Sequence, residues 1–231
     1  MILDEERLIP EVAVEISLQE HLARYRFARE RARGGILDVA CGAGYGTAML
    51  GAVGGDLSLG VLRYAARHYP APYVATDALR LPFGRAFDTV VSFETIEHLR
   101  DPERFVSECV RVLRPGGLFI VSTPNRDLWS PHSSSPFFHP HVREFNRKEF
   151  LAILRPLRVE LFCQRLMDRH VAAAFQLKEI GKHVIRAFVP FRRFRCIAMR
   201  RLEEIVPHPE FAVTPCDSRT PAFFVAVAEP L

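Results

Sequence analysis

A glycine-rich segment is the first group of residues in this 231-residue sequence whose types and spacing could do chemistry. Gly42-Ala-Gly44-Tyr-Gly46 follows a short apolar run, Ile36-Leu-Asp38-Val-Ala40. A glycine loop after a buried strand presents backbone N–H groups to a nucleotide. The dinucleotide fingerprint requires a glycine at position 47, which is threonine here. The spacing therefore argues against NAD.

Carboxylates stand at the ends of three successive apolar runs of strand length. They are Asp38, Asp56 in Gly-Asp-Leu-Ser, and Asp77 in Thr-Asp-Ala. Open α/β sheets bind ligands at the carboxyl ends of their strands, so these side chains are expected at one edge. Asp56 is suited to a ribose diol, which needs a bidentate acceptor, and Asp77 to an adenine amino group.

The second chemical group is Glu94-Thr-Ile-Glu97-His98, with His139 and His141 farther along the chain. A helical turn beginning at Glu94 would place Glu94, Glu97 and His98 on one face. Together with His141, these side chains could bind a divalent ion. His98 could instead act alone as a general base. A third alternative is structural: acids that complement a helix dipole, beside an incidental histidine.

Alternating apolar and helical patterns predict the elements that position these residues. A leading helix begins at the capping-box spacing Ser17-Leu-Gln-Glu20 and runs to about Arg31. Further strands are expected around residues 52–55, 73–76, 87–93, 118–123, 159–163 and 222–228, and helices over 59–68, 101–113 and 147–154. Arg114-Pro-Gly-Gly117 reads as a turn. This order predicts an α/β fold, Rossmann-like, with a mostly parallel sheet and helices on both faces.

The expected organisation is a single domain over residues 1–231. It has a leading helical segment (1–34), a cofactor-binding core (35–163), a basic helical insertion (164–206) and a final strand (207–231). Residues 143–201 contain 15 basic and 5 acidic side chains, although the whole chain has a net charge of only +4. Lys178, Lys182 and Arg186 form one helical stripe, which is either a solvated face or a contact with an anionic membrane or phosphorylated substrate.

Composition is that of a globular protein, with 48% hydrophobic and 25% charged residues. The acidic beginning does not resemble a signal peptide, and no apolar run approaches the roughly 18 residues of a membrane span. The five cysteines are scattered without a Cys-x-x-Cys pair, so reduced thiols are expected. These features predict a soluble cytoplasmic protein, with a peripheral membrane contact if the basic stripe provides one.

Five ordered motifs resemble those of class I S-adenosylmethionine-dependent methyltransferases over about residues 18–150. They are Ile-Leu-Asp-Val-Ala-Cys-Gly-Ala-Gly-Tyr-Gly, Gly-Asp-Leu-Ser, Asp-Ala-Leu-Arg-Leu-Pro-Phe, Phe-Asp-Thr-Val-Val-Ser and Arg-Val-Leu-Arg-Pro-Gly-Gly. The resemblance implies a seven-stranded sheet with an antiparallel last strand, and S-adenosylmethionine as cofactor. It also implies a role for each cofactor-site residue: Asp38, Gly42 and Gly44 at the methionine end, Asp56 at the ribose, Asp77 and Ala78 at the adenine, and Arg24 at the methionine carboxylate.

The first crossover departs from the usual length. Only residues 47–54 separate the glycine loop from Gly55-Asp56, whereas a crossover usually needs about 10 to 12 residues. A short helix and a brief second strand are therefore expected. This departure also motivates an alternative, a non-catalytic nucleotide-binding protein.

The Glu-x-x-Glu-His pattern with a later histidine resembles two metal-dependent branches, the ubiquinone-pathway O-methyltransferases and the small-RNA 2′-O-methyltransferases. Other segments resemble methyltransferases of bacterial surface-glycan pathways. These resemblances imply methyl transfer to a hydroxyl of a small-molecule, glycan or lipid-linked acceptor, with a divalent ion held by Glu94, Glu97, His98 and His141. RNA 2′-O-methylation is the alternative; nucleic acid is less favoured as a partner because the segment after Pro124 lacks an evident stacking platform.

Overall fold

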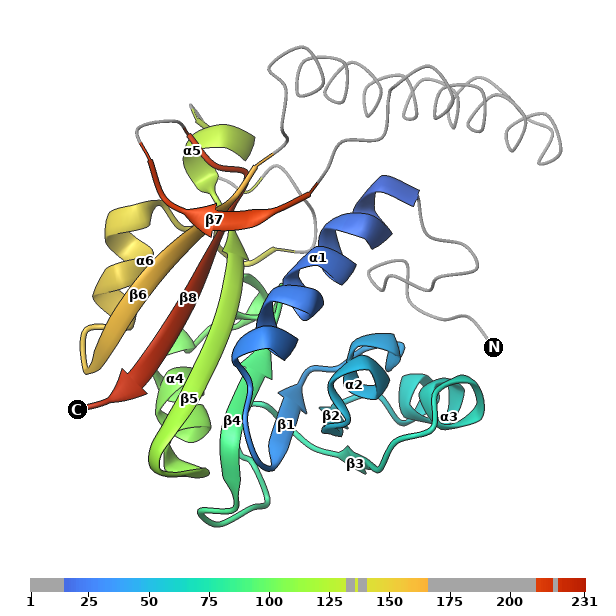
Figure 1. Ribbon diagram of the computed structural model, residues 1–231. Helices are drawn as coiled ribbons and strands as arrows, with labels where there is room; N and C mark the ends of the chain where they lie inside the picture. The colour runs from blue at the N-terminus through green and yellow to red at the C-terminus, as the bar shows by residue number, and fades with distance from the viewer. Residues whose placement is uncertain (1–14, 132–135, 137–140, 166–210, 218–219) are drawn as a thin grey trace, which may run out of the picture. The chain divides into compact units, whose positions relative to one another are not determined.

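The computed structural model in Figure 1 describes residues 15–131, 136, 141–165, 211–217 and 220–231. The chain divides into two compact units, residues 1–164 with 212–231, and residues 165–211. Almost all of the second unit lies outside the described residues. The predicted helical insertion, with Lys178, Lys182 and Arg186, therefore stays a prediction.

Eight strands of the described chain form one sheet in the order β3-β2-β1-β4-β5-β8-β6-β7. Strands β1 to β5 are parallel neighbours, and β8 runs antiparallel between β5 and β6, as expected of the last strand. The predicted seven strands were one too few, because the short β7 pairs with the end of β6. The strands are β1 (Ile36–Val39), β2 (Val53–Asp56), β3 (Tyr73–Ala75), β4 (Phe87–Ser92), β5 (Leu113–Pro124), β6 (Leu157–Gln164), β7 (Val213–Pro215) and β8 (Phe223–Pro230).

Helices cover both faces of the sheet, which confirms the predicted fold class (Figure 1). Successive strand residues point to opposite faces, so Val90 and Phe119 join one buried cluster while Val91 and Ile120 join another. The first cluster includes side chains of α4 (Pro102–Arg111) and α6 (Arg147–Ile153), and the second includes side chains of α1 (Glu15–Arg31) and α2 (Tyr45–Leu50). Burial on both faces explains the continuous apolar runs of the central strands.

Local caps set most helix boundaries. The Ser58 side chain accepts from Val61 N at the beginning of α3 (Leu59–His68), and Asp101 accepts from Arg104 N at the beginning of α4. A capping box begins α6, in which Asn146 accepts from Glu149 N and Glu149 accepts from Asn146 N. The capping box expected at Ser17 was wrong, because Ser17 lies inside α1.

The short first crossover closes as predicted, with a brief helix and a four-residue second strand. Helix α2 has six residues and is bounded by Gly44 and Gly51, both in the left-handed conformation (φ 86° and 64°). Strand β2 then pairs in parallel with β1, with Val39 opposite Gly55. Left-handed glycines at both ends let the chain turn abruptly, and a crossover of these few residues therefore fits.

The predicted turn at Arg114-Pro-Gly-Gly117 lies within β5 rather than before it. Leu113 pairs with Phe87 and Leu118 with Thr89, so the residues between them bulge out of the ladder. Gly116 adopts a φ of 73° in this bulge. The turn chemistry was therefore recognised correctly, but β5 begins earlier than the sequence suggested.

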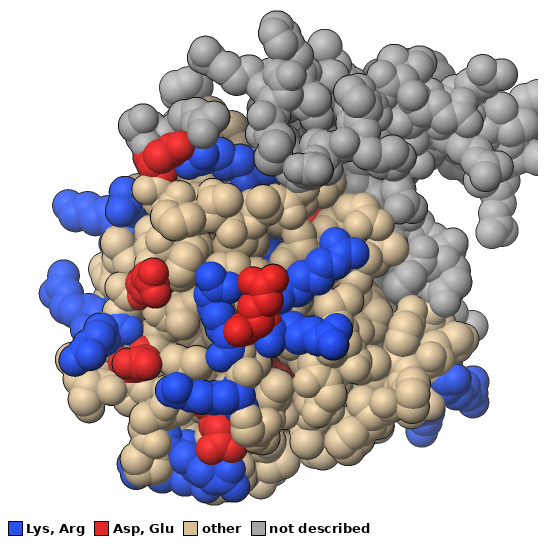
Figure 2. All heavy atoms as spheres, in the orientation of Figure 1, with Lys and Arg blue, Asp and Glu red and all other residues tan. Residues whose placement is uncertain are grey.

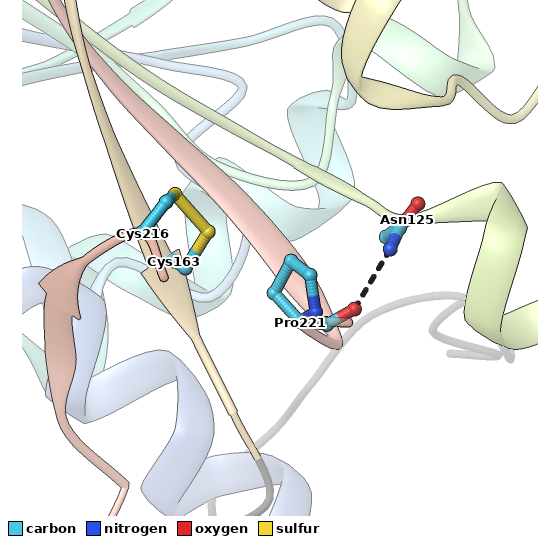
Figure 3. The surroundings of a disulfide bond; sticks show 4 residues. All are labelled: Asn125, Cys163, Cys216 and Pro221. Atoms are coloured by element: carbon cyan, nitrogen blue, oxygen red, sulfur yellow. Dashed lines mark hydrogen bonds between the residues drawn. A yellow bond between two sulfur atoms is a disulfide. The ribbon is translucent and has the colours of Figure 1, made fainter. Parts of the chain in front are cut away.

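A disulfide contradicts the expectation that all five cysteines are reduced. Cys163 in β6 is bonded to Cys216, which follows β7, with a Cα–Cα distance of 5.0 Å (Figure 3). The two cysteines are 53 residues apart, and only the antiparallel pairing of β6 with β7 brings them together. Cys41 and Cys109 are free and buried, while Cys196 lies outside the described residues.

Charged side chains of the described chain do not form a single basic patch on the face drawn in Figure 2, where Lys and Arg are interspersed with Asp and Glu. Arg31 pairs with Glu30, and Arg33 lies 4.0 Å from Glu229. In the part of the chain that the structure describes, no helix combines the length and apolar character needed to cross a membrane.

Candidate active site

The glycine loop after β1 is held by a carboxylate from the next strand. Gly42 N donates to Asp56 Oδ2 at 3.0 Å, and Ser58 N donates to Asp56 Oδ1 at 2.9 Å. Asp56 is buried. This side chain, which was predicted to bind the ribose, therefore also connects the glycine loop to the beginning of α3. A Cβ on Gly42 would meet nothing within 4 Å, whereas one on Gly44 would meet the Tyr73 hydroxyl at 2.5 Å. Gly42 therefore presents an open side, and Gly44 is required for packing.

Asp38, at the base of the same loop, is completely buried beneath it. Its Oδ2 accepts from Thr47 Oγ1 at 2.7 Å, and the Tyr25 hydroxyl lies 3.3 Å from both carboxylate oxygens. Burial raises the pKa of Asp38 to about 7, although these two hydrogen bonds oppose the rise. Thr47, at the position where a dinucleotide site has glycine, is therefore a structural partner of Asp38. Tyr25 was not identified from the sequence, which showed only an apolar position on the leading helix.

Asp77 and Ala78 lie at the end of β3, as the strand order predicted. Asp77 is exposed, and its Oδ1 accepts from Leu79 N at 2.8 Å. Its carbonyl accepts from Arg80 N, which closes a turn. Ala78 packs against the core from its half-buried position. Asp77 is thus open to solvent, whereas Asp56 is buried and each of its oxygens already accepts one backbone hydrogen bond.

Arg24 is a fully buried cation on α1, only 1% exposed. Its Nη1 donates to Gln164 Oε1, its guanidinium lies 4.4 Å from the centroid of the Phe223 ring, and its Nη2 is 4.0 Å from Glu94 Oε1. Within the described chain its Nε has no hydrogen-bond partner. An unsatisfied buried donor on a cation is suited to an anionic group, which is the role the family resemblance implies for this residue.

Glu94 does not share a face with the other predicted metal ligands. It has a φ of 51°, a left-handed conformation that places it before the single helical turn η1 (Ile96–His98). Its Oε1 accepts from Ser122 Oγ at 2.8 Å and faces Arg24. The expected continuous turn from residue 94 was therefore wrong, because a non-glycine residue in this conformation redirects the chain.

Glu97, His98 and His141 do converge. Each can offer one ligand atom, and these three atoms lie within 4.8 Å of one another. The His98 and His141 rings are 4.8 Å apart between centroids, at an interplanar angle of 83°. His139 lies outside the described residues. Three of the four predicted metal ligands therefore meet here, and Glu94 is the one that does not.

Glu97 is a buried carboxylate whose two oxygens differ in their hydrogen bonding. It is 0% exposed; its Oε2 accepts from Thr123 Oγ1 at 3.2 Å, but its Oε1 has no hydrogen-bond partner among the described residues. Burial raises the pKa of Glu97 well above its ordinary value, and the nearby Glu94 raises it further. A buried carboxylate with a bare oxygen is costly unless a proton or a cation neutralises it.

The donor set fits a divalent ion. One carboxylate and two imidazoles suit manganese, iron or zinc, and oxygen ligands also admit magnesium. Ligand atoms about 2.1 Å from one ion are at most about 4.2 Å apart, so the observed spread needs a closure of less than about 1 Å. The bare Glu97 oxygen is the position such an ion would satisfy.

Two further side chains, not identified from the sequence, support the histidine pair. Glu144 Oε1 lies 3.0 Å from His141 Nδ1, and Ser130 Oγ donates to Glu144 Oε2 at 2.6 Å. Val142 N and Arg143 N donate to the Glu97 carbonyl at 2.9 and 3.1 Å. The only sequence signal was the acidic residue three positions after His141, which is too common to be informative.

Comparison with known proteins agrees with this geometry. Residues 37–121 match the family model described as methyltransferase domain. A "probable S-adenosylmethionine-dependent methyltransferase" of Mycolicibacterium smegmatis is 39% identical over 158 residues, which are 64% of this chain and 62% of that protein. A ubiquinone biosynthesis O-methyltransferase of Rhizobium etli is 35% identical over 104 residues, 40% of this chain and 42% of the relative. The chain thus matches less than two thirds of the length of these curated relatives.

Solved structures agree with the fold. A crystal structure of an S-adenosylmethionine-dependent methyltransferase from Thermotoga maritima superposes with a TM-score of 0.67 and covers 93% of this chain and 92% of its own. Its sequence is only 16% identical, so this likeness concerns architecture alone. The family match over the strands that carry the glycine loop and the carboxylates is the stronger finding: residues 37–121 match the methyltransferase domain family, and the similar mycobacterial relative is named as a probable S-adenosylmethionine-dependent methyltransferase.

Proposed function

We propose that this protein transfers the methyl group of S-adenosylmethionine to a hydroxyl oxygen of a small-molecule or glycan-like acceptor, with a divalent ion at Glu97, His98 and His141. The observation that carries the proposal is the fully buried Glu97 side chain, which clusters with two histidines and has one oxygen without a hydrogen-bond partner among the described residues. This cluster follows β4, the neighbour of the strand that precedes the glycine loop. Donor and acceptor groups would therefore meet at one sheet edge.

On the donor side, the residues bind and orient. The open side of Gly42 receives the methionine end, and the Nε of Arg24, which has no hydrogen-bond partner in the described part of the chain, pairs with its carboxylate. Asp77 accepts from the adenine amino group beside Ala78. Asp56 holds the loop and reaches the ribose with the remaining lone pairs of its two oxygens, since each carboxylate oxygen can accept more than one bond.

The reaction is an in-line displacement. The acceptor oxygen forms a bond to the methyl carbon, the carbon–sulfur bond breaks, and its electron pair neutralises the sulfonium to give S-adenosylhomocysteine. Orientation of the reactants can supply roughly 7 to 11 kcal/mol of the barrier reduction. A hydroxyl is a poor nucleophile until its proton leaves. Glu97, His98 and His141 would hold a divalent ion, which would supply Lewis acidity toward the acceptor hydroxyl, and the proton of that hydroxyl would pass to solvent.

Support for an oxygen acceptor comes from two sources. The matched relatives include a protein named as a ubiquinone biosynthesis O-methyltransferase. The site also contains carboxylate and imidazole groups suited to removing a proton, which a hydroxyl acceptor needs. A hydroxyl on a glycan or a lipid-linked molecule must lose a proton in the same way, so the proposed acceptor class includes both.

Two measurements test the proposal. Titration calorimetry with S-adenosylhomocysteine should give saturable binding, while NAD should give none. Transfer of a labelled methyl group is then followed with a catechol, a sugar and a short RNA as acceptors, with and without a chelator. Transfer to catechol or sugar that stops in chelator and returns with manganese supports the proposal. Full activity in chelator would leave His98 as a simple base, and transfer only to RNA would overturn the acceptor class.

A further inference from the structure

We infer that Glu144 is a positioning residue that holds His141 in the tautomer with its Nε2 unprotonated, and that Ser130 anchors Glu144 for this task. The inference rests on the proposed function, because it assigns His141 Nε2 as the atom offered to the ion. Glu144 is 2% exposed and lies three residues from His141. It belongs to neither the glycine loop nor the group of ligand side chains.

Hydrogen-bond chemistry determines the tautomer. An ionised carboxylate can only accept, so with Glu144 ionised the 3.0 Å contact between its Oε1 and His141 Nδ1 selects the tautomer with the proton on Nδ1. The neutral ring then carries its lone pair on Nε2. A histidine that binds a metal commonly donates its other N–H to a carboxylate in this way, which orients the ring and makes it a stronger ligand.

The second oxygen of Glu144 explains why the carboxylate stays in place. Ser130, the residue that ends the short helix α5 (Arg126–Trp129), donates to Oε2 at 2.6 Å and is itself buried. Asn125, which begins α5, forms a bridge with Phe145, the residue after Glu144. Contacts at both ends of α5 therefore connect this helix to the Glu144 segment. These contacts fix the position of the Glu144 carboxylate.

The same segment also orients Glu97. Val142 N and Arg143 N, which follow His141, both donate to the Glu97 carbonyl. Residues 141–145 therefore set the position of His141 through Glu144 and contact the backbone of Glu97 directly. A change at Glu144 should act on the histidine without removing the contacts that hold η1.

The test begins with the protein freed of metal, where it does not depend on ion binding. Long-range ¹H–¹⁵N NMR at mildly alkaline pH distinguishes the two neutral histidine tautomers. We expect His141 in the Nδ1–H form in the wild type, and a shift toward the Nε2–H form in Glu144→Ala and in the volume-conserving Glu144→Gln. Glu149→Gln is the control, because Glu149 is a nearby carboxylate that pairs with Arg126 and caps α6 instead.

Manganese titration follows on the same proteins. Glu144→Ala is expected to weaken manganese binding by about 10- to 100-fold, Ser130→Ala by less, and Glu149→Gln not at all. An unchanged tautomer in both Glu144 variants, or unchanged manganese affinity in them, would overturn the positioning role. If the wild type binds no manganese but the wild type and variants show the expected tautomers, the metal ion of the proposed function is refuted. The role of Glu144 in orienting His141 is then still supported.

Discussion

The two halves of the candidate site handle buried charge differently. On the donor half, formed by the glycine loop with Asp38, Asp56 and Asp77, each carboxylate accepts hydrogen bonds from the protein. On the acceptor half, at the ends of β4 and β5, Glu97 is as buried as Asp38 but keeps one oxygen without a partner in the described chain. The carboxylates of the donor half are therefore held by backbone N–H groups and side-chain hydroxyls of the described chain, while one Glu97 oxygen in the acceptor half has no such partner there.

Glu97→Gln should produce the largest effect, because it removes the charge that the acceptor half presents to an ion. We expect methyl transfer to fall by roughly 1,000-fold, about 4 kcal/mol of transition-state stabilisation. S-adenosylhomocysteine affinity, measured by calorimetry, should change by less than about twofold. In metal-free protein the variant should be more stable than the wild type, since it no longer buries an unpaired carboxylate. Equal losses of activity and of S-adenosylhomocysteine binding would show that the halves are not separate.

The disulfide borders the donor half, because Cys163 precedes Gln164, the partner of Arg24. Replacing both Cys163 and Cys216 with serine opens a closed loop of 53 residues, which on chain-entropy grounds lowers the free energy of unfolding by about 4 kcal/mol. Chemical denaturation measures this loss, with Cys109→Ser as the control for removing a thiol. Manganese affinity should be unaffected; a large loss there would mean that the covalent bond also supports the acceptor half.

Asp38 gives the donor half a pH-dependent stability. Its pKa is raised from 3.8 in the unfolded chain to about 7, so the folded state binds the proton more tightly. This contribution is fully present below about pH 4 and is lost as the pH rises through about 7, amounting to a few kcal/mol. Asp38→Asn should therefore gain stability relative to wild type between pH 4 and pH 8. A difference that is constant across this range, measured by urea denaturation, would place the folded pKa near its ordinary value.

The smallest effects are expected at Asp56 and Asp77, the two carboxylates proposed to contact the ribose and the adenine. Asp56→Ala leaves two backbone N–H groups without their acceptor, so S-adenosylhomocysteine affinity should fall by about 1 to 3 kcal/mol. Asp77→Ala removes an exposed carboxylate with one backbone contact, and about 1 kcal/mol is expected. Calorimetry on both variants checks the order. A greater loss for Asp77→Ala would mean that the adenine contact outweighs the loop support.

Much of the donor half could be predicted from local sequence, because its residues lie next to strand ends. Asp38, Gly42, Asp56 and Asp77 each lie at or just after the end of an apolar run, and parallel strands bring such ends to one edge. Tyr25 could not be predicted, since its bond to Asp38 depends on how α1 packs over the loop. Glu94 was misplaced because its left-handed conformation is not visible in a Glu-x-x-Glu-His spacing.

The amino-acid sequence by itself determined the α/β class, the mostly parallel sheet, the short α2 and the chemical types present at the site. These features depend on periodicity, caps and glycine positions, which act within a few residues. Tertiary structure alone decided that Cys163 meets Cys216, that Glu144 contacts His141, and that Glu97 is buried with a bare oxygen. Burial and the position of a turn within the packed chain decide such contacts, and neither is encoded in residue spacing.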